Sequence, residues 1–219
     1  AYGSGVDATS AGCGIAVKNH VINCVLEYNY IHDTGGSSDS GGLGVMTNNS
    51  SFSGPENLDI RYNIVKNCRG GFSAFYNSSL RYPVRIYGNI FLQNQSSAMI
   101  GATSVTGMSI RVYNNTFYQN CSNTGSYEIN FPEAGNYSTF EFQNNVICAR
   151  SGKGAFYCSN GSKITKHTNN IYYRPDSGTF ASIGGTAYNA GNITSWESTG
   201  YSGSPNFKNT AGLPGGIIG

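Results

Sequence analysis

The sequence predicts an all-β protein, folded as a right-handed parallel β-helix solenoid of about six to seven coils with an internal Asn ladder. The first observation is a motif that recurs six times, starting with EYNYIHD at residues 27–33, and each copy holds one asparagine at the same place. These asparagines are Asn29, Asn63, Asn89, Asn115, Asn145 and Asn170, which are 34, 26, 26, 30 and 25 residues apart. A near-constant period in this range is typical of solenoids, in which each repeat packs only against its neighbours.

The second observation is a composition that favours strands and turns. Glycine contributes 30 of the 219 residues, about twice its average share, and residues that favour helices are scarce. Charged residues make up 11% of the chain and the net charge is +2. This low charge argues against nucleic acid and anionic membranes as partners. No apolar run approaches the roughly 18 residues of a membrane span.

The third observation is the alternation of apolar and polar residues around the ladder asparagines. Positions three before, five before and two after the asparagine are almost all aliphatic or aromatic, which predicts three inward columns. In the last repeat, His167 and Thr165 interrupt two of these columns. We expect the asparagine side chains to hydrogen-bond to the copies above and below, and to support sharp corners in the left-handed conformation.

The elements follow the chain in order. Residues 1–12 read as an extended lead-in, residues 13–175 as the β-helix, and residues 176–219 as a capping segment and tail. Each repeat should hold at least two strands, one through the ladder asparagine and one after a Gly- or Ser-rich turn, starting with CGIAV at residues 13–17. Around Trp196 we expect a short helix, followed by a turn at Pro205–Phe207.

Outward positions carry charges that should pair between coils. Four residues before the ladder asparagine stand Asp59, Arg85, Arg111, Glu141 and Lys166, and two residues before it Glu27 is followed by Arg61. Coils about 4.8 Å apart place these side chains next to one another, mostly with opposite charges. We therefore predict a structural role for these arginines.

The Asn-x-hydrophobic repeats resemble those of secreted proteins of the pectate-lyase-like β-helix superfamily, over roughly residues 13–175. The resemblance implies the fold and a Trp-containing segment that packs over or along the last coil. It also implies that polysaccharide-active members work on an exposed face of parallel strands.

That face suggests candidate site residues. Eliminating across a uronic acid needs a base beside a group that neutralises the carboxylate. The candidate catalytic residues are Lys66, Tyr118, His32 and Arg150, and the candidate substrate-binding residues are Arg69, Gln93, Gln119 and Tyr173. A solvated polar face would give the same pattern. The acidic clusters of calcium-dependent pectate lyases and of inverting hydrolases are missing.

No metal or other cofactor is expected. The three histidines lack metal-site spacing, and the cysteines form no C-x-x-C pair. Residues 32–42 (HDTGGSSDSGG) offer Asp33 and Asp39 to a calcium ion but lack the alternation of an EF-hand loop. A Gly/Ser insertion explains this stretch more simply.

Cysteines and sequons favour an extracellular location. Six cysteines suit an oxidising compartment, although buried free thiols give the same count. We predict the pairs Cys148–Cys158, Cys13–Cys24 and Cys68–Cys121. Of nine Asn-x-Ser/Thr sequons, we exclude Asn114, inside the repeat, and predict N-glycans on Asn48, Asn49, Asn77, Asn94, Asn120, Asn136, Asn160 and Asn192. The start at Ala1-Tyr2-Gly3-Ser4 suggests a mature or trimmed product.

Two functions remain open at the level of sequence. The first is a secreted, glycosylated structural protein that self-associates through its coil ends, because unpaired strand edges can template end-to-end stacking into filaments. The alternative is a lyase of uronic-acid polymers or a carbohydrate-binding β-helix.

Overall fold

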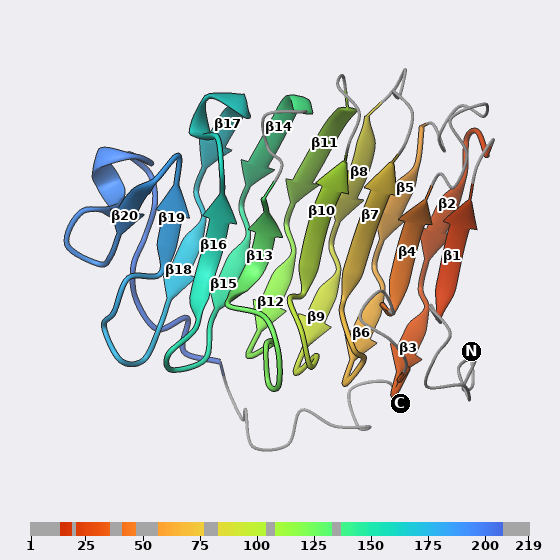
Figure 1. Ribbon diagram of the computed structural model, residues 1–219, viewed down its shortest axis with the longest axis horizontal. Helices are drawn as coiled ribbons and strands as arrows, with labels where there is room; N and C mark the ends of the chain where they lie inside the picture. The colour runs from red at the N-terminus through yellow and green to blue at the C-terminus, as the bar shows by residue number, and fades with distance from the viewer. Residues whose placement is uncertain are drawn as a thin grey trace.

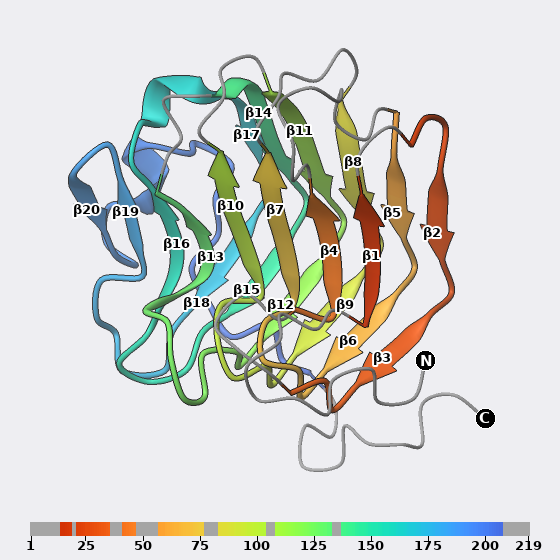
Figure 2. The same ribbon diagram turned by 45° about the vertical axis from the view of Figure 1, so that its right-hand side comes forward.

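The computed structural model describes residues 14–18, 21–35, 41–46, 57–76, 83–103, 108–132 and 137–207. The chain forms a parallel β-solenoid in which consecutive coils lie side by side along the long axis, from β1 to β20 (Figure 1). Each coil contributes one strand to each of three sheets (Figure 2). The two six-stranded sheets span five steps, so the solenoid makes about five turns, fewer than the six to seven expected.

The first sheet contains β1 (Ile15–Lys18), β4 (Leu43–Met46), β7 (Phe72–Tyr76), β10 (Met99–Thr103), β13 (Tyr127–Phe131), β16 (Gly154–Cys158), β19 (Ala181–Ile183) and β20 (Thr186–Tyr188). The second contains β2 (Val25–Glu27), β5 (Asp59–Arg61), β8 (Val84–Tyr87), β11 (Met108–Tyr113), β14 (Tyr137–Gln143) and β17 (Ile164–Thr168). The third contains β3 (Tyr30–His32), β6 (Ile64–Lys66), β9 (Ile90–Leu92), β12 (Thr116–Tyr118), β15 (Val146–Cys148) and β18 (Ile171–Tyr173). In the described ranges, the short 3₁₀ helices η2 (Gly161–Lys163) and η3 (Ile193–Ser195) flank the last strands of the solenoid.

The corner at the ladder lies one residue earlier than predicted. The residue before each ladder asparagine has a positive φ, as at Tyr28 (57°), Tyr62 (55°) and Gly88 (66°). This left-handed residue breaks the predicted long strand in two, which is why each repeat holds three strands. The ladder asparagine itself is therefore free to turn its side chain inward and hydrogen-bond.

The inward columns form the core as predicted. Phe91 and Phe117 stack with ring centroids 5.3 Å apart and lie in the column two residues after the ladder asparagine. Both side chains are fully buried. The expected inward position of Thr165 is wrong, because the register shifts at Phe140 and pairs it with Ile164 instead. Ile164 is buried and Thr165 is exposed, so the core remains apolar at that position.

The predicted Asn ladder is present and hydrogen-bonded throughout. The Asn89 Oδ1 accepts from both the backbone N (3.0 Å) and the Nδ2 (2.9 Å) of Asn63, one coil earlier. The Nδ2 of Asn89 donates to Asn115 Oδ1 (3.0 Å), Ile60 O (2.8 Å) and Tyr87 O (3.1 Å). The same pattern continues from Asn115 through Asn145 to Asn170. The ladder therefore satisfies backbone groups that the corner would otherwise leave buried and unpaired.

A second, shorter ladder lies five residues after the first, at the corner between the third and first sheets. Asn94 Oδ1 accepts from the backbone N of Cys68 (2.8 Å), and Asn120 Oδ1 accepts from the N (3.0 Å) and Nδ2 (2.7 Å) of Asn94. Both asparagines are fully buried. This burial contradicts the prediction that Asn94 and Asn120 carry glycans, because their side-chain amides are enclosed and already hydrogen-bonded within the ladder.

Both ladders end on a buried glutamate. Glu197 accepts hydrogen bonds from the backbone N (2.8 Å) and Nδ2 (3.0 and 3.2 Å) of Asn170 and from the Tyr172 hydroxyl (2.8 Å). Glu128 Oε2 accepts from Asn120 Nδ2 at 2.6 Å. Each ladder presents amide donors to the next coil, so a carboxylic acid or carboxylate oxygen completes the last rung.

The C-terminal segment covers the last coil. The Trp196 ring stacks on His167 with centroids 4.4 Å apart and also contacts Phe156. Strand β19 continues the first sheet beyond residue 175, and the antiparallel β20 ends it. An antiparallel hairpin changes the strand direction presented at this end of the solenoid.

The predicted ion pairs form along the outer face of the second sheet. Arg61 pairs with Glu27 (2.7 Å), Arg85 with Asp59, and Arg111 with Glu141 (3.2 Å). Arg85 and Arg111 lie on neighbouring strands, but Arg85 pairs with the acid one coil earlier and Arg111 with the acid one coil later. These arginines have structural partners, as the sequence predicts.

Candidate functional site

Three of the predicted catalytic residues share one outward column on the third sheet. His32, Lys66 and Tyr118 occupy the same register position, together with Leu92, Cys148 and Tyr173. The sequence therefore places them on one face. The middle of that face is apolar, however, because Leu92, Tyr118 and Cys148 form a small cluster outside the main core, with exposed fractions of 4%, 7% and 4%.

The candidate bases are spread along this column, and each has its own neighbours. Strand β9 separates Lys66 from Tyr118 by two strand spacings, roughly 9–10 Å. The His32 Nδ1 lies 2.8 Å from Asp33 Oδ2, and its ring stacks on Tyr30. The Arg150 Nε donates to the carbonyl oxygens of Gln119 (2.7 Å) and Asn120 (3.0 Å). Arg150 is thus engaged with two backbone carbonyls beside Tyr118, while Lys66 and His32 lie on earlier coils.

The predicted substrate-binding residues divide into two groups. Gln93 and Gln119 both lie at the corner after the third sheet, with φ of 54° and 47°. Arg69 lies after the second coil, where its backbone N donates to Thr34 O (2.9 Å). Only Gln119 and Tyr173 join Tyr118 around a common cavity.

That cavity, which we call the seam pocket, lies between the third sheet and the segment 201–207, which we call the strap. Its volume is 320 Å³. Its wall is formed by Tyr118, Gln119, Cys148, Ala149, Tyr173, Pro175, Ser204, Pro205, Asn206 and Phe207. The sequence predicts a turn at Pro205–Phe207 over the last coil, but it does not indicate that this turn lines a site.

The strap is fixed to the solenoid at both of its described ends. The Tyr201 N donates to Asn170 O (2.9 Å), and Tyr201 O accepts from Tyr172 N (2.8 Å). At the other end, the Phe207 ring meets Tyr118 edge to face, with centroids 5.4 Å apart. The strap therefore continues the pairing of the third sheet at Tyr201 and then crosses its outer face.

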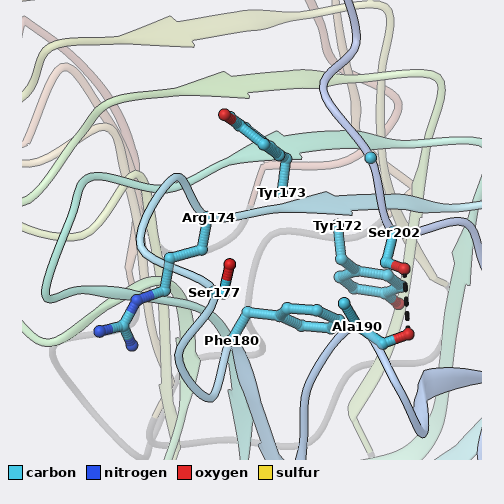
Figure 3. Close-up of a pocket in the computed structure, with 8 residues that line it drawn as sticks. Tyr172, Tyr173, Arg174, Ser177, Phe180, Ala190 and Ser202 are labelled. Carbon is cyan, nitrogen blue, oxygen red and sulfur yellow. Dashed lines mark hydrogen bonds between the residues drawn. The ribbon is translucent and has the colours of Figure 1, made fainter.

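A second cavity of 160 Å³ lies on the other side of Tyr173 (Figure 3). Its floor is the stacked pair Tyr172 and Phe180, and Ser202 Oγ donates to Ala190 O (3.2 Å) at one side. Figure 3 shows the Arg174 guanidinium directed away from these rings. It is bound to the Asp176 carboxylate and to Thr179 O. The hydrogen bond with Asp176 raises the pKa of Arg174 and lowers that of Asp176.

The seam pocket is suited to binding rather than to proton transfer. Among the residues that the structure describes, none of its lining side chains is Asp, Glu, Lys, Arg or His. Burial, with a smaller effect of the nearby Glu128 carboxylate, raises the pKa of the Cys148 thiol to about 12. This thiol is therefore protonated at neutral pH, and it is a weak nucleophile in that state.

The predicted disulfides are not formed among the described cysteines. Cys24, Cys68, Cys121, Cys148 and Cys158 are all free thiols. Cys148 belongs to the outer cluster and Cys158 to the main core. The predicted pair is therefore wrong, because the two cysteines are close in sequence but belong to different hydrophobic clusters. Cys68 and Cys121 also remain unpaired with each other, and Cys13 lies outside the described residues.

Among the other predicted glycan sites, Asn192 is exposed and Asn160 half-buried, whereas Asn48, Asn49, Asn77 and Asn136 lie outside the described residues. The proposed calcium loop is only partly described, since Asp39 lies outside, and Asp33 contacts His32 and Asn67. In the described ranges, no three His, Cys, Asp or Glu side chains are grouped to hold a metal ion. Nor does this part of the chain hold a helix with the length and apolar character of a membrane span.

Comparison with known proteins adds no relative. No protein-family model, curated protein or solved structure matches the chain. The assignment as a parallel β-solenoid therefore rests on the strand pairing and ladders described above.

Proposed function

We propose that this protein is an extracellular, carbohydrate-binding β-helix of the pectate-lyase-like type, and that it binds a neutral sugar in the seam pocket. The observation that carries this proposal is a concave wall whose described residues include aromatic and amide side chains but no charged ones. The aromatic and amide side chains are those of Tyr118, Tyr173, Gln119 and Asn206. Aromatic rings pack against the C–H faces of sugars, and amides can both donate to and accept from hydroxyl groups. The volume of 320 Å³ fits the lower end of ligand pockets.

An extracellular location is compatible with the free thiols. Cys68, Cys121, Cys148 and Cys158 are buried, and burial raises the pKa of each thiol. The thiolate, which is the reactive form, is therefore disfavoured. The exposed sequon at Asn192 would be open to glycosylation in a secreted protein.

The test is binding to xylan, mannan, β-glucan and galactan as neutral polysaccharides, with polygalacturonate and alginate as acidic ones. We expect affinity electrophoresis to show retardation on at least one neutral polymer. Replacing Gln119 with alanine should then weaken binding about tenfold. This change corresponds to about 1.4 kcal/mol, which is the contribution of one hydrogen bond.

The matched control is Gln93→Ala, one coil earlier at the same corner position and outside the pocket wall. Both substitutions place alanine at a positive φ, so their effects on folding should be similar. The proposal fails if no neutral polymer is bound, or if both variants lose affinity equally.

We propose self-association through the first coil as a second function. Exposed apolar and aromatic side chains are concentrated there, since Ile22, Val25 and Tyr28 have exposed fractions of 49%, 46% and 75%. Strands β1, β2 and β3 are the terminal strands of their sheets. At the other end, Trp196 and β20 cover the solenoid, so this proposal favours pairing of two first coils over long head-to-tail filaments.

We expect sedimentation velocity and electron microscopy to show dimers, and Val25→Asp to convert them to monomers because it places a charge in the contact. Asp59→Ala, on the next strand of the same outer face, serves as the control. Monomers alone in the unmodified protein at high concentration would refute this second proposal.

A further inference from the structure

Glu128 is a carboxyl group enclosed inside the solenoid next to the seam pocket. It lies on β13, and its side chain has no exposed surface. Its Oε2 accepts from Asn120 Nδ2 at 2.6 Å, while its Oε1 makes no hydrogen bond with the described part of the chain. A buried carboxylate with an unpaired oxygen is unfavourable, whereas a protonated carboxyl in the same place costs much less.

In the described part of the chain, Arg150 is the cation whose charge acts on Glu128. The thiols of Cys121 and Cys148 lie close, and burial raises the pKa of both to about 12, so both are neutral below that pH. Arg150 is near enough for its positive charge to favour the ionised carboxyl. The positive charge of Lys153 acts on the Cys121 thiol, and its Nζ donates to Gly125 O (2.8 Å). Ionisation of Glu128 would therefore act mainly on Arg150.

Arg150 connects this carboxyl to the wall of the seam pocket. Its Nε holds the carbonyl oxygens of Gln119 and Asn120. Gln119 lines the pocket, and Ala149, which precedes Arg150, does so as well. Asn120 is also the partner of Glu128. The same short segment is thus held by Arg150 through its carbonyls and by Glu128 through the Asn120 amide.

We propose that Glu128 is a positioning residue for the seam pocket. Its ionisation draws Arg150 away from the Gln119 and Asn120 carbonyls, and Gln119 is then no longer held in its position in the pocket wall. In the neutral state, Arg150 stays on the two carbonyls and the pocket keeps the described shape. When the carboxyl gives its proton to solvent, the new negative charge competes for the guanidinium. This inference rests on the proposed sugar site for its effect on binding.

The pH range follows from the direction of the shift. Burial raises the pKa of Glu128 from 4.5 to about 8, although the Asn120 hydrogen bond and the Arg150 charge oppose this. The folded protein therefore holds one more proton than the unfolded chain between these values, and stability falls as the pH rises through this range. The change in the pocket should follow the folded pKa, so it occurs just above neutral pH.

The experiment is an NMR titration of the full chain from pH 5.5 to 9.5. We expect the Glu128 carboxyl ¹³C shift and the Gln119 side-chain ¹⁵N shift to change with one midpoint near pH 8. In Glu128→Gln the Gln119 shift should stay constant over the titration. In the control Glu141→Gln, which changes a half-buried carboxylate on the outer face of the second sheet, the Gln119 shift should still change with the midpoint near pH 8. Polymer affinity should fall about tenfold by one pH unit above the midpoint, because about one molecule in ten then keeps a neutral Glu128.

A Gln119 signal that stays constant while Glu128 titrates would overturn the inference. Should Glu128→Gln fail to fold, Arg150→Gln provides the second variant, in which Glu128 still titrates and Gln119 no longer follows it. A protein that binds none of the polysaccharides but shows the coupled midpoint would refute only the proposed function, and the positioning of the wall by Glu128 would stand.

Discussion

Replacing Glu197 with alanine is expected to lower the free energy of unfolding by about 3–5 kcal/mol, the usual cost of breaking a buried charged network. The carboxylate accepts from the backbone N and Nδ2 of Asn170 and from the Tyr172 hydroxyl. Without it, these donors remain buried with no acceptor, because the whole site has almost no exposed surface. Urea unfolding followed by circular dichroism at pH 7 measures the loss.

Two variants separate the hydrogen bonds at Glu197 from the size of its side chain. Glu197→Gln keeps one carbonyl acceptor and a similar volume, so we expect it to lose less than the alanine variant. Glu141→Ala removes a carboxylate from a surface pair whose Arg111 and Glu141 side chains are 48% and 26% exposed, which should cost at most about 1 kcal/mol. If Glu197→Ala and Glu141→Ala lost the same stability, the terminal role of Glu197 would be wrong.

Replacing Asn89 with alanine should cost about 3–4 kcal/mol, because it opens the first ladder at its middle. The Asn63 backbone N and Nδ2 lose their shared acceptor. The carbonyl oxygens of Ile60 and Tyr87 lose a donor in the same buried corner. Thermal and urea unfolding at several wavelengths would record both the loss and any departure from a single transition.

The control for Asn89 is Asn114→Gly, at an exposed corner position with φ of 57°. Glycine adopts this conformation readily, so we expect a change within about 1 kcal/mol. Equal losses in the two variants would show that the corner conformation, and not the ladder hydrogen bonds, carries the stability. A change below about 1 kcal/mol in Asn89→Ala would contradict the ladder as a stabilising element.

The second ladder shows why part of the fold could not be predicted from the sequence. Its repeat contains only two asparagines, Asn94 and Asn120, while Cys68 and Arg150 occupy neighbouring coils. A pattern of two members does not stand out in a chain rich in asparagine. The same residues also match the sequon pattern, which led to the wrong expectation of surface glycans. Their burial follows from the corner between two sheets, and the repeat does not reveal that corner.

The candidate site was predictable in part. The outward column holding Tyr118 and Tyr173 follows from the strand register, because stacked coils bring equivalent positions together. The sequence could not reveal that Leu92 and Cys148 would make the same column apolar and closed. It also could not place Phe207 on Tyr118, since the strap has no counterpart within the repeat.

The sequence by itself determined the coil repeat, the inward columns, the first ladder and the ion pairs on the second sheet. Parallel stacking in register converts a period in the chain into columns in space, so these features need only local pattern. The tertiary structure decided how the ladders end on Glu197 and Glu128, which thiols stay apart, and where the strap forms a pocket. Glu197 and the strap lie outside the period, whereas the contacts of Glu128 and the thiols depend on how neighbouring coils pack. The burial that fixes their chemistry exists only after the coils and the strap have packed together.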